Sequence, residues 1–592
     1  MRRAPERPRT GSVVHPLLAI KLPAWRSKFL LFLLFCAFVV LALRAAWLQG
    51  GGSTEFLQQQ GKVRWLRTLE VPATRGKVTD RNGVVLAASV PARAIFASPE
   101  GVEATPQQLA QLARLLDMSS SELARKLGDD DRRFVYLRRQ VEPQIAARIA
   151  ALKIKGIGEH RDFRRHYPEG MTNAHLVGVT NVEDRGQEGV ELAFESRLAA
   201  RSGSRRVIKD NLHRFVEEDW LRPPVDGADL ALSVDNRIQY IAFSAIRQAV
   251  EASRAKAGAA VVLDVRSGEV LALANWPSFD PNLSAAERGR WQADALRNRA
   301  LTDTFEPGST LKPFSVAAAL DARRVTPQQS FQTAPGWIRV ADRTIRDSHP
   351  HGVLTVEQIV AKSSNVGTVR IAMDLPAQAL WDLYTGVGFG QPVRIEFPGA
   401  VTGRLRPAKS WREIEHATIS YGYGVSVSLM QLARAYTVFA RDGDMVPASL
   451  VKQQAAAGVV VLRPETARQM RRMLEQAASE EGTAPQARFA GYRVAGKTGT
   501  SRKLRDGRYV NEYVASFAGF APASDPRIVV AVMIDEPGAG RYYGGDIAAP
   551  VFAQIASASL RTLQVAPDAA APDPAKPAEP VLAKVAARGD KL

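Results

Sequence analysis

The sequence predicts three successive parts: a single-pass membrane anchor, a mixed α+β domain, and a larger α/β domain built from apolar β-hairpins and helices. Three observations predict them. An apolar run of 20 residues follows a basic N-terminal stretch. Strand and helix patterns with turn signals then alternate as far as a boundary rich in proline and glycine at 222–227. Beyond it lie two apolar hairpins and several helical stretches.

Length and composition limit the possible functions. At 592 residues the chain can hold two or three domains with large hydrophobic cores. Its net charge of +19 is compatible with binding to nucleic acid or to an anionic membrane surface, or with an arginine-rich composition that has no such role. No nucleic-acid motif occurs, so we expect no nucleic-acid partner. The single cysteine, Cys36, excludes an intramolecular disulfide, and the eight histidines show no metal spacing, so no metal or other cofactor is expected.

The first 48 residues predict a cytoplasmic tail and a membrane anchor. Residues 1–28 carry seven basic side chains and one acid, and prolines break them, which predicts an unstructured basic tail. Residues 29–48 are apolar except for Arg44, and a helix of that length at about 1.5 Å per residue spans the roughly 30 Å of bilayer hydrocarbon. Arg44 can snorkel, and Trp47 suits the interface. The preceding positive charge predicts a cytoplasmic N-terminus, with the remainder of the chain across the membrane.

A cleaved signal peptide is the alternative for this segment. Gly50-Gly51-Gly52 supplies small residues for cleavage. However, the apolar run is longer than the hydrophobic region of a signal peptide, and it ends in Arg-Ala-Ala-Trp rather than Ala-x-Ala. An uncleaved anchor is therefore favoured.

The second part, 49–225, is polar and mixed. The pattern predicts a strand at 65–71, a strand–turn–strand unit at 74–87 with its turn at Arg81-Asn82-Gly83, amphipathic helices at 104–127 and 141–152, and a further helix after 188–191. No catalytic group of side chains stands out here, which favours a positioning or docking domain.

The third part, 226–565, carries the longest apolar patterns. It predicts a strand at 229–234, a helix at 235–253, a hairpin at 259–265 and 269–274, helices through 314–324, 354–374 and 428–442, a strand at 492–501, a second hairpin at 514–520 and 527–535, and a closing helix after Pro550. From 566 to 592 the chain is rich in alanine, proline and lysine and is predicted to be disordered.

The stretch from Glu306 to Pro313 holds the first candidate for catalysis. Ser309 and Lys312 are three residues apart, so a helix places them on one face. Pro313 must lie near the first turn of that helix, which puts Ser309 at its N-terminal end, where unpaired N–H groups favour an oxyanion. The same spacing also occurs at Ser253/Lys256 and Ser449/Lys452, but only the copy at 309 has the Pro-Gly lead-in and a following proline.

Two further motifs follow in order, Ser363-Ser364-Asn365 and Lys497-Thr498-Gly499, each of which occurs once. Singly each motif is weak. The ordered set S-x-x-K, S-x-N and K-T-G is typical of penicillin-binding proteins and serine β-lactamases. The set predicts that Ser309 is a catalytic nucleophile.

The resemblance extends beyond these motifs, from the anchor to about residue 564. The stretches 74–83 and 188–191 resemble the pedestal of class B penicillin-binding proteins. The stretches 298–303, 420–424, 519–524 and 542–552 resemble the FtsI-type septal transpeptidase. The tail is unmatched, and His213 stands where a turn glycine is usual, which puts that pedestal turn in doubt.

This resemblance implies an elongated α+β pedestal or dimerisation-like domain followed by a penicillin-binding transpeptidase domain, in which an antiparallel sheet is flanked by helices as in serine β-lactamases. It implies a peptidoglycan D,D-transpeptidase of the serine-type D-Ala-D-Ala carboxypeptidase class, which acts on stem peptides ending in D-Ala-D-Ala and is inhibited by β-lactams. It also implies the inner membrane as the location, with the catalytic domain in the periplasm. The partners implied are an FtsW-type glycan polymerase and other divisome membrane proteins.

Each motif residue then has an expected role. Lys312, neutral, would be the base for Ser309, and Lys497, charged, would bind the substrate carboxylate and lower the pKa of Lys312. Ser363 would relay a proton between the lysines and the leaving amine, and Asn365 would bond a substrate amide. Thr498 and Thr500 suit the carboxylate, and Gly499 lets substrate lie along the strand edge. The N–H groups of Ser309 and Thr500 are the expected oxyanion donors, one such donor being worth about 3 kcal/mol. Tyr421 to Gly424 could be a substrate contact or only a tight loop.

Three other functions stay open from sequence alone. A β-lactamase or β-lactam sensor shares the acylation machinery, and rapid nitrocefin turnover would favour it. The elongation-type transpeptidase differs in cellular location. A non-enzymatic divisome scaffold would tolerate loss of Ser309, so complementation by Ser309→Ala separates it from an enzyme.

Overall fold

A computed structural model describes residues 23–50, 66–128, 134–209, 215–283, 287, 293–452 and 457–569. The predicted cytoplasmic tail before 23, the doubtful pedestal turn at 210–214 and residues 570–592 of the predicted disordered tail lie outside this part. The described residues form two compact units, 1–71 with 202–224, and 72–201 with 225–592. The predicted pedestal range, 49–225, is thus shared between them.

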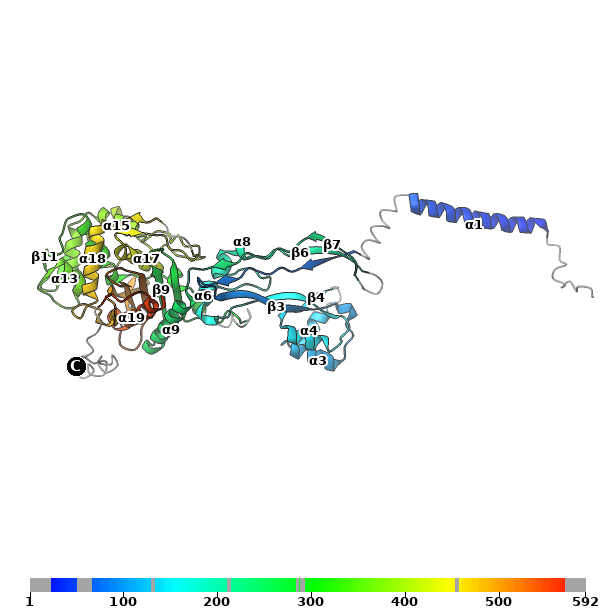
Figure 1. Ribbon diagram of the computed structural model, residues 1–592, viewed down its shortest axis with the longest axis horizontal. Coiled ribbons are helices and arrows are strands. Elements are labelled where there is room, and N and C mark those ends of the chain that lie inside the picture. Colours follow the sequence, from blue (N-terminus) through cyan, green and yellow to red (C-terminus); the bar gives the residue numbers. More distant parts are fainter. Residues whose placement is uncertain are drawn as a thin grey trace, which may run out of the picture. The chain divides into compact units, whose positions relative to one another are not determined.

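The first unit contains the helix of the predicted anchor and one sheet (Figure 1). Helix α1 (Ala24–Gly50) includes the whole predicted run, and its first 24 residues are long and apolar enough to cross a membrane. A separate antiparallel sheet has the order β1-β6-β7, made of β1 (Leu66–Val71), β6 (Gly203–Lys209) and β7 (Phe215–Arg222). The strand predicted at 65–71 is confirmed.

The second unit begins with a small α+β lobe. Its sheet has the order β4-β3-β2-β8, with β5 also paired to β3. The strands are β2 (Val78–Thr79), β3 (Val85–Ala97), β4 (Val135–Val141), β5 (Ile157–His166) and β8 (Leu230–Ala231). The helices are α3 (Pro106–Leu115), α4 (Ser120–Leu127), α5 (Pro143–Ala150), α6 (Ala174–Val177), α7 (Gly189–Ala193) and α8 (Glu195–Leu198).

One predicted helix of this lobe is wrong in its extent. The pattern at 104–127 predicts a continuous helix, but the structure breaks it into α3 and α4. Asp117 takes a left-handed conformation, with φ of 50°, and Ser119 caps the N-terminus of α4 by accepting from the Glu122 N–H. A residue with positive φ cannot continue an α-helix, and a serine cap favours a new start.

A buried ionic cluster ties the lobe together. The Glu191 carboxylate accepts from Arg75 Nε at 2.6 Å and from Arg165 Nε at 2.7 Å, and all three side chains are at most 2% exposed. Arg165 also donates to the Gly76 carbonyl. Two guanidiniums thus share one buried carboxylate. Removing it would leave Arg165 without this buried acidic partner and would leave Arg75 paired with Glu195 alone.

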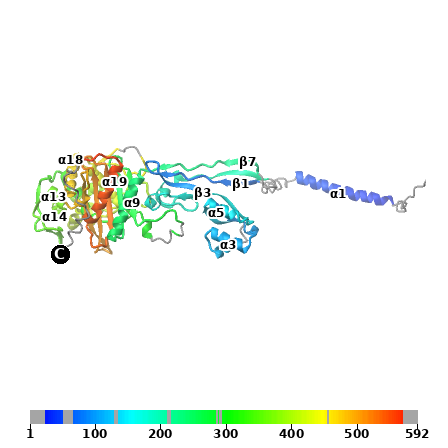
Figure 2. The same cartoon turned by 60° about the horizontal axis from the view of Figure 1, so that its bottom comes forward.

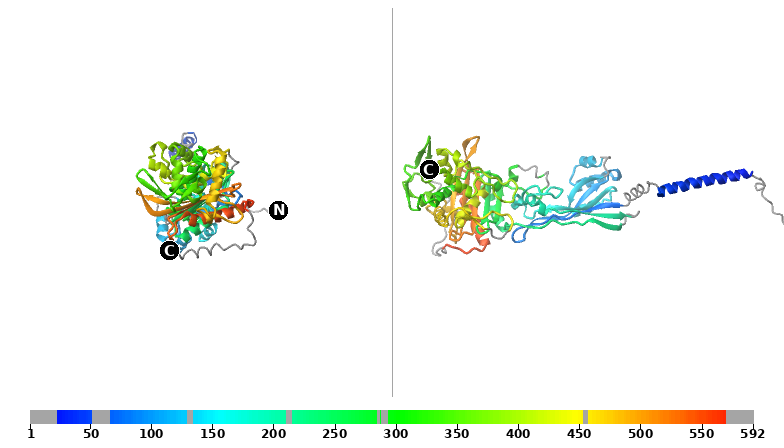
Figure 3. Two further views of the ribbon diagram at one scale, coloured as in Figure 1. Left: turned by 90° about the vertical axis from the view of Figure 1, so that its left-hand side faces the viewer. Right: turned by 90° about the horizontal axis from the view of Figure 1, so that it is seen from above.

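The large domain that follows the lobe is built on a five-stranded antiparallel sheet with the order β10-β9-β19-β18-β17. The strands are β9 (Ala257–Asp264), β10 (Val270–Trp276), β17 (Ala495–Arg505), β18 (Arg508–Ala521) and β19 (Ile528–Asp535). Both predicted hairpins are confirmed. The sheet joins the early strands β9 and β10 to the late strands β17, β18 and β19. In the left view of Figure 3, the green early segments and the orange late segments therefore lie together in one body.

Helices cover both faces of this sheet. On one face α9 (Asn236–Ser253) and α19 (Gly544–Thr562) lie side by side, packed on alternate strand residues such as Val262 and Val530 (Figures 1 and 2). On the other face α17 (Leu429–Ala440) packs on the intervening residues, such as Val261 and Val529. Phe314 of α12 (Lys312–Asp321) packs in turn on Tyr436 and Phe439 of α17. Apolar side chains on both faces explain why these strands are continuous apolar runs.

The remaining elements complete the domain. They are α11 (Arg299–Thr302), β11 (Ser330–Gln332), β12 (Trp337–Val340), β13 (Arg343–Arg346), β14 (Val353–Thr355), α13 (Val356–Lys362), α14 (Asn365–Met373), α15 (Ala377–Gly386), α16 (Glu413–Ile419), β15 (Asp444–Met445), β16 (Val459–Val460) and α18 (Pro464–Ala477), with 3-10 turns η4 (Ala293–Leu296), η5 (Gly308–Thr310), η6 (Ala408–Ser410) and η7 (Pro485–Ala487). The 3-10 turns η2 (Pro99–Gly101) and η3 (Gly170–Thr172) belong to the α+β lobe.

Two boundaries near the C-terminus differ from expectation. The closing helix starts at Gly544, before Pro550, which lies inside it with an exposed ring. The helix starts early because Gly544 packs on β17 and donates its N–H to Thr500 Oγ1 at 3.0 Å. The chain also stays attached beyond 566, since the Asp568 carboxylate accepts from Arg493 N–H at 2.7 Å and from Ser524 Oγ at 2.6 Å.

Candidate functional site

Ser309 lies on a 3-10 turn, η5, directly before α12. Pro313 is the second residue of α12, so the helix starts where proline permits, as predicted. Gly308 has φ of 55°, and its N–H donates to the Gly422 carbonyl at 3.1 Å. Thr310 Oγ1 bonds back to the Pro307 carbonyl at 2.7 Å. The turn is thereby fixed on both sides of a half-buried Ser309.

The Lys312 amine is enclosed beneath that turn. The side chain is 1% exposed, and Nζ donates to Ser363 Oγ at 3.1 Å and to the Ser363 carbonyl. Burial lowers the pKa of Lys312 to about 7, although the negative charge of Asp347 raises it in part. An amine with this pKa can exchange protons near neutral pH.

Ser363 and Asn365 lie at the junction of two helices. Ser363 ends α13 in a left-handed conformation with φ of 60°, which brings its carbonyl and hydroxyl to Lys312. Asn365 opens α14, and its Nδ2 donates to the Arg346 carbonyl at the end of β13, at 2.7 Å. The first residue of the S-x-N motif, Ser363, thus holds the Lys312 amine from a second segment, while Asn365 is held by β13.

Asp347 is a site residue that no motif indicated. Its carboxylate accepts from Ser364 Oγ at 2.7 Å, from Val366 N–H at 3.0 Å and from Asn365 N–H. It therefore caps the N-terminus of α14 and carries a negative charge close to Lys312. An acid directly after a strand was the sole signal in the sequence, and it is too common to be specific.

Lys497 is on β17, the edge strand of the sheet, and is 0% exposed. Its Nζ lies 3.3 Å from Thr498 Oγ1 and 3.4 Å from Thr483 Oγ1. Burial lowers the pKa of Lys497 well below 10.5, and a positive charge on Lys312 lowers it further. Because a positive charge on Lys312 disfavours one on Lys497, the two buried amines favour one proton between them rather than two.

The threonines of this strand take part in a hydroxyl network. Thr498 Oγ1 lies 3.0 Å from Thr483 Oγ1, and Thr500 Oγ1 accepts from the Gly544 N–H. Thr483 lies between α18 and η7, outside every motif, so a single sequence gave no signal for it.

Gly499 is explained by packing behind the strand. A Cβ there would lie 2.8 Å from the Pro307 carbonyl oxygen and 2.9 Å from Thr310 Cγ2. Only a glycine lets β17 approach the turn that carries Ser309 this closely.

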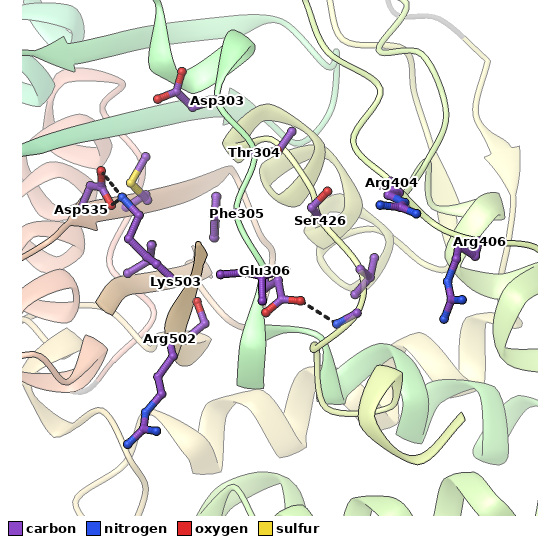
Figure 4. A pocket seen from close by; sticks show the side chains of 16 residues that line it. Asp303, Thr304, Phe305, Glu306, Arg404, Arg406, Ser426, Arg502, Lys503 and Asp535 are labelled. Atoms are coloured by element: carbon purple, nitrogen blue, oxygen red, sulfur yellow. Dashed lines mark hydrogen bonds and ion pairs between the residues drawn. The ribbon is translucent and has the colours of Figure 1, made fainter. Parts of the chain in front are cut away.

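A pocket of about 500 Å³ is lined by Phe305 and Glu306, which precede the serine turn in the chain (Figure 4). Glu306 lines it, and its Oε1 accepts from the Gly424 N–H at 2.7 Å and from Tyr509 OH at 3.2 Å. Burial raises the pKa of Glu306. The Tyr421–Gly424 segment therefore supports the serine turn through Gly422 and Gly424, and a substrate contact by its tyrosines stays a prediction.

The two other S-x-x-K serines lie in different surroundings. Ser253 ends α9 and bonds to the Ala249 carbonyl at 2.6 Å, while Ser449 bonds to the Val451 carbonyl at 2.8 Å. Within the described residues no group of histidine, cysteine and acidic side chains could hold a metal ion.

Family comparisons agree with the two-domain reading. The family model of the penicillin-binding protein transpeptidase domain matches residues 258–557, and that of the penicillin-binding protein dimerisation domain matches residues 70–232. The first match lies inside the predicted catalytic range, 226–565, whereas the second begins inside the predicted pedestal range, 49–225, and runs seven residues beyond it.

Curated relatives and solved structures give the same family. The chain is 41% identical over 549 residues to a probable peptidoglycan D,D-transpeptidase PenA of Neisseria gonorrhoeae, covering 92% of this chain and 93% of the relative. It is 39% identical over 560 residues to the peptidoglycan D,D-transpeptidase FtsI of Escherichia coli K12, with the same coverages. The transpeptidase domain of Burkholderia pseudomallei penicillin-binding protein 3 is 48% identical, with a TM-score of 0.53, covering 57% of this chain and 98% of that structure. The chain belongs to the class B penicillin-binding proteins and is a peptidoglycan D,D-transpeptidase.

Proposed function

We propose that this transpeptidase cross-links stem peptides at the division septum through an acyl-enzyme on Ser309. Ser309 Oγ attacks the carbonyl carbon of the penultimate D-alanine, and the bond to the terminal D-alanine breaks. The terminal D-alanine leaves with a proton on its nitrogen. An amine of a second stem peptide then attacks the ester, which forms the cross-link and restores the serine hydroxyl. A β-lactam resembles the dipeptide and stalls at the ester.

The observation that carries the proposal is the buried Lys312 amine bonded to Ser363 beneath the Ser309 turn. With a pKa of about 7, about half of this amine is neutral at pH 7. A lysine in water, with a pKa of about 10.4, is neutral in only about 0.04% of molecules at that pH. Burial therefore raises the amount of free base by about a thousandfold.

Lys497 takes the second role, holding the substrate's terminal carboxylate. In the free site, burial disfavours its charge. The substrate's carboxylate, placed beside Thr498 and Thr500, would raise the pKa of Lys497. The proton shared by the two lysines would then reside on Lys497. Its charge would in turn keep Lys312 neutral, so binding of the correct substrate would complete the base.

The other motif residues complete the donor site. Ser363, bonded to Lys312, relays the proton to the leaving nitrogen. Asn365, held by its bond to Arg346, presents its carbonyl oxygen to a substrate N–H. The open edge of β17 offers main-chain partners to an extended peptide, and the N–H groups of Ser309 and Thr500 receive the oxyanion.

Mass spectrometry of the full chain treated with a labelled penicillin tests this assignment. One adduct on Ser309 is expected, with none in Ser309→Ala. Ser449→Ala, which removes the serine of another S-x-x-K match, is the matched control and should acylate normally. An adduct elsewhere, or rapid multiple turnover of nitrocefin, would contradict a transpeptidase that acts through Ser309.

The division role and membrane topology rest on the relatives and on α1. The identity of 39% with an FtsI across 92% of the chain favours septal rather than elongation-specific synthesis. We propose that α1 is an inner-membrane anchor with a cytoplasmic N-terminus, that the catalytic domain is periplasmic, and that an FtsW-type polymerase and other divisome proteins are its partners. A fluorescent fusion should gather at midcell, whereas an even signal along the cell wall would favour the elongation-type function.

A further inference from the structure

The β12–β13 hairpin presents an outer face that the fold does not use. Trp337 pairs with Arg346, and Arg339 pairs with Thr344, so these four side chains project from one side of the hairpin. All four are exposed, with Trp337 at 48%. The opposite side packs Ile338, Val340 and Ile345 on α14, α16 and Tyr421. We call the four side chains the hairpin outer face.

The two guanidiniums of this face form no ion pair with an acidic side chain in the described part of the domain. Among the described residues, Arg346 has no acidic partner, and Arg339 bonds only to the nearby Ala341 carbonyl, at 3.4 Å. Residues 337–346 contain three arginines and one aspartate. A half-exposed indole between two unpaired guanidiniums is a composition typical of binding surfaces.

This face is continuous with the candidate active site. The residue that ends β13, Arg346, accepts the Asn365 amide through its carbonyl, and the next residue, Asp347, caps α14 beside Lys312. A ligand held by the Trp337 and Arg346 side chains would therefore lie next to the backbone that positions Asn365 of the S-x-N motif. A second substrate has to approach Ser309 from some such neighbouring surface once the donor fills the edge of β17.

We propose that the hairpin outer face binds the acceptor strand of peptidoglycan, a proposal that rests on the function proposed above. Acceptor strands combine stem-peptide carboxylates with sugar rings. Guanidiniums bind carboxylates in a bidentate manner, and an indole offers a flat apolar surface to a sugar ring. Side chains two residues apart on a strand are about 7 Å apart, and cross-strand pairs about 5 Å, so the face matches one or two units of such a strand.

The test separates acceptor binding from donor chemistry. The full chain in detergent, the Trp337→Ala variant and the Arg339→Glu variant are given a small thioester donor. Soluble glycan strands whose stem peptides lack the terminal D-alanine serve as acceptor, because they cannot acylate Ser309. The control is Arg343→Glu, which removes and reverses a charge on the same hairpin but pairs with Val340 on the other side.

The acceptor KM is expected to rise about tenfold or more in both outer-face variants and to stay within about twofold in Arg343→Glu. Penicillin acylation should remain within about twofold in all of them, since the hairpin backbone that holds Asn365 is unchanged. High salt should weaken acceptor binding to the unaltered chain.

Several results would overturn the proposal. These are an unchanged acceptor KM, an equal rise in Arg343→Glu, or a parallel loss of penicillin acylation, which would make the hairpin only a support for Asn365. Failure to bind strands, with capture of an acidic divisome protein instead, would assign the face to a protein partner and would also overturn it. Direct binding of the strands to Ser309→Ala needs no catalysis, so failure of the proposed function would be recognised separately.

Discussion

Acylation of Ser309 is expected to follow pH with an inflection near 7, because Lys312 must lose a proton before it can accept one from the serine. With a pKa of about 7, the neutral fraction of Lys312 is about 0.09 at pH 6 and about 0.91 at pH 8. The second-order rate constant for acylation should therefore rise about tenfold over this interval and then level off. The charges of the buried Lys312 and Lys497 amines interact, so their titrations are coupled. The inflection in the rate therefore reports the titration of the pair rather than that of Lys312 alone.

The assay is acylation by a fluorescent penicillin, quenched at short times and quantified on a gel, from about pH 5.5 to about pH 9. A flat profile between pH 6 and 8, or an inflection near the pKa of a free lysine, would refute the assignment of a buried neutral amine as base. Asp347→Asn supplies the internal check. The Asp347 charge raises the pKa of Lys312, so its removal should move the inflection to lower pH. A shift to higher pH would contradict the electrostatic argument.

Three further substitutions test the support of the site and of the lobe beside it. Gly499→Ala places a methyl group 2.8 Å from the serine turn and should slow penicillin acylation by about a hundredfold, while Gly352→Ala, with nothing within 4 Å, should not. Thr483→Val removes a hydroxyl from the network on β17 and should slow acylation about tenfold without lowering the melting temperature; an unchanged rate would show that the network is dispensable. Glu191→Gln leaves two buried arginines without their shared carboxylate and should cost about 3–5 kcal/mol in thermal unfolding, against less than about 1 for Glu251→Gln in an exposed pair.

The sequence predicted the candidate site where residue type and position coincide in a motif. Pro313 located the start of α12, and the first two motifs supplied Lys312 and Ser363, whose side chains are in contact in the structure. The charge of Lys312 also acts on Lys497, the lysine of the third motif. The catalytic role of Ser309 stays a prediction. The apolar hairpins predicted the central sheet because strands buried on both faces need continuous apolar runs. These are local signals, so one sequence was enough to identify them.

What the sequence did not predict depends on distant contacts. Asp347 and Thr483 reach the site only because β13 and the turn after α18 fold onto it, and neither has a distinctive neighbour in the sequence. The packing reason for Gly499 likewise lies in Pro307 and Thr310, nearly two hundred residues earlier in the chain. The break between α3 and α4 depends on the left-handed Asp117, which an amphipathic pattern does not reveal.

The strand order also fixes when the enzyme can become active. β17 is held in the sheet through β18, β18 through β19, and β19 is the strand that pairs with β9. A chain that folds from its N-terminus therefore has Ser309 and Lys312 long before Lys497 has a fixed position beside them. The last strand to emerge, Ile528–Asp535, is the one that joins the two halves of the site. Proteolysis or truncation that removes this strand would leave a chain with an intact nucleophile motif but no assembled acylation site, so the topology itself keeps incomplete chains from reacting with the cell wall.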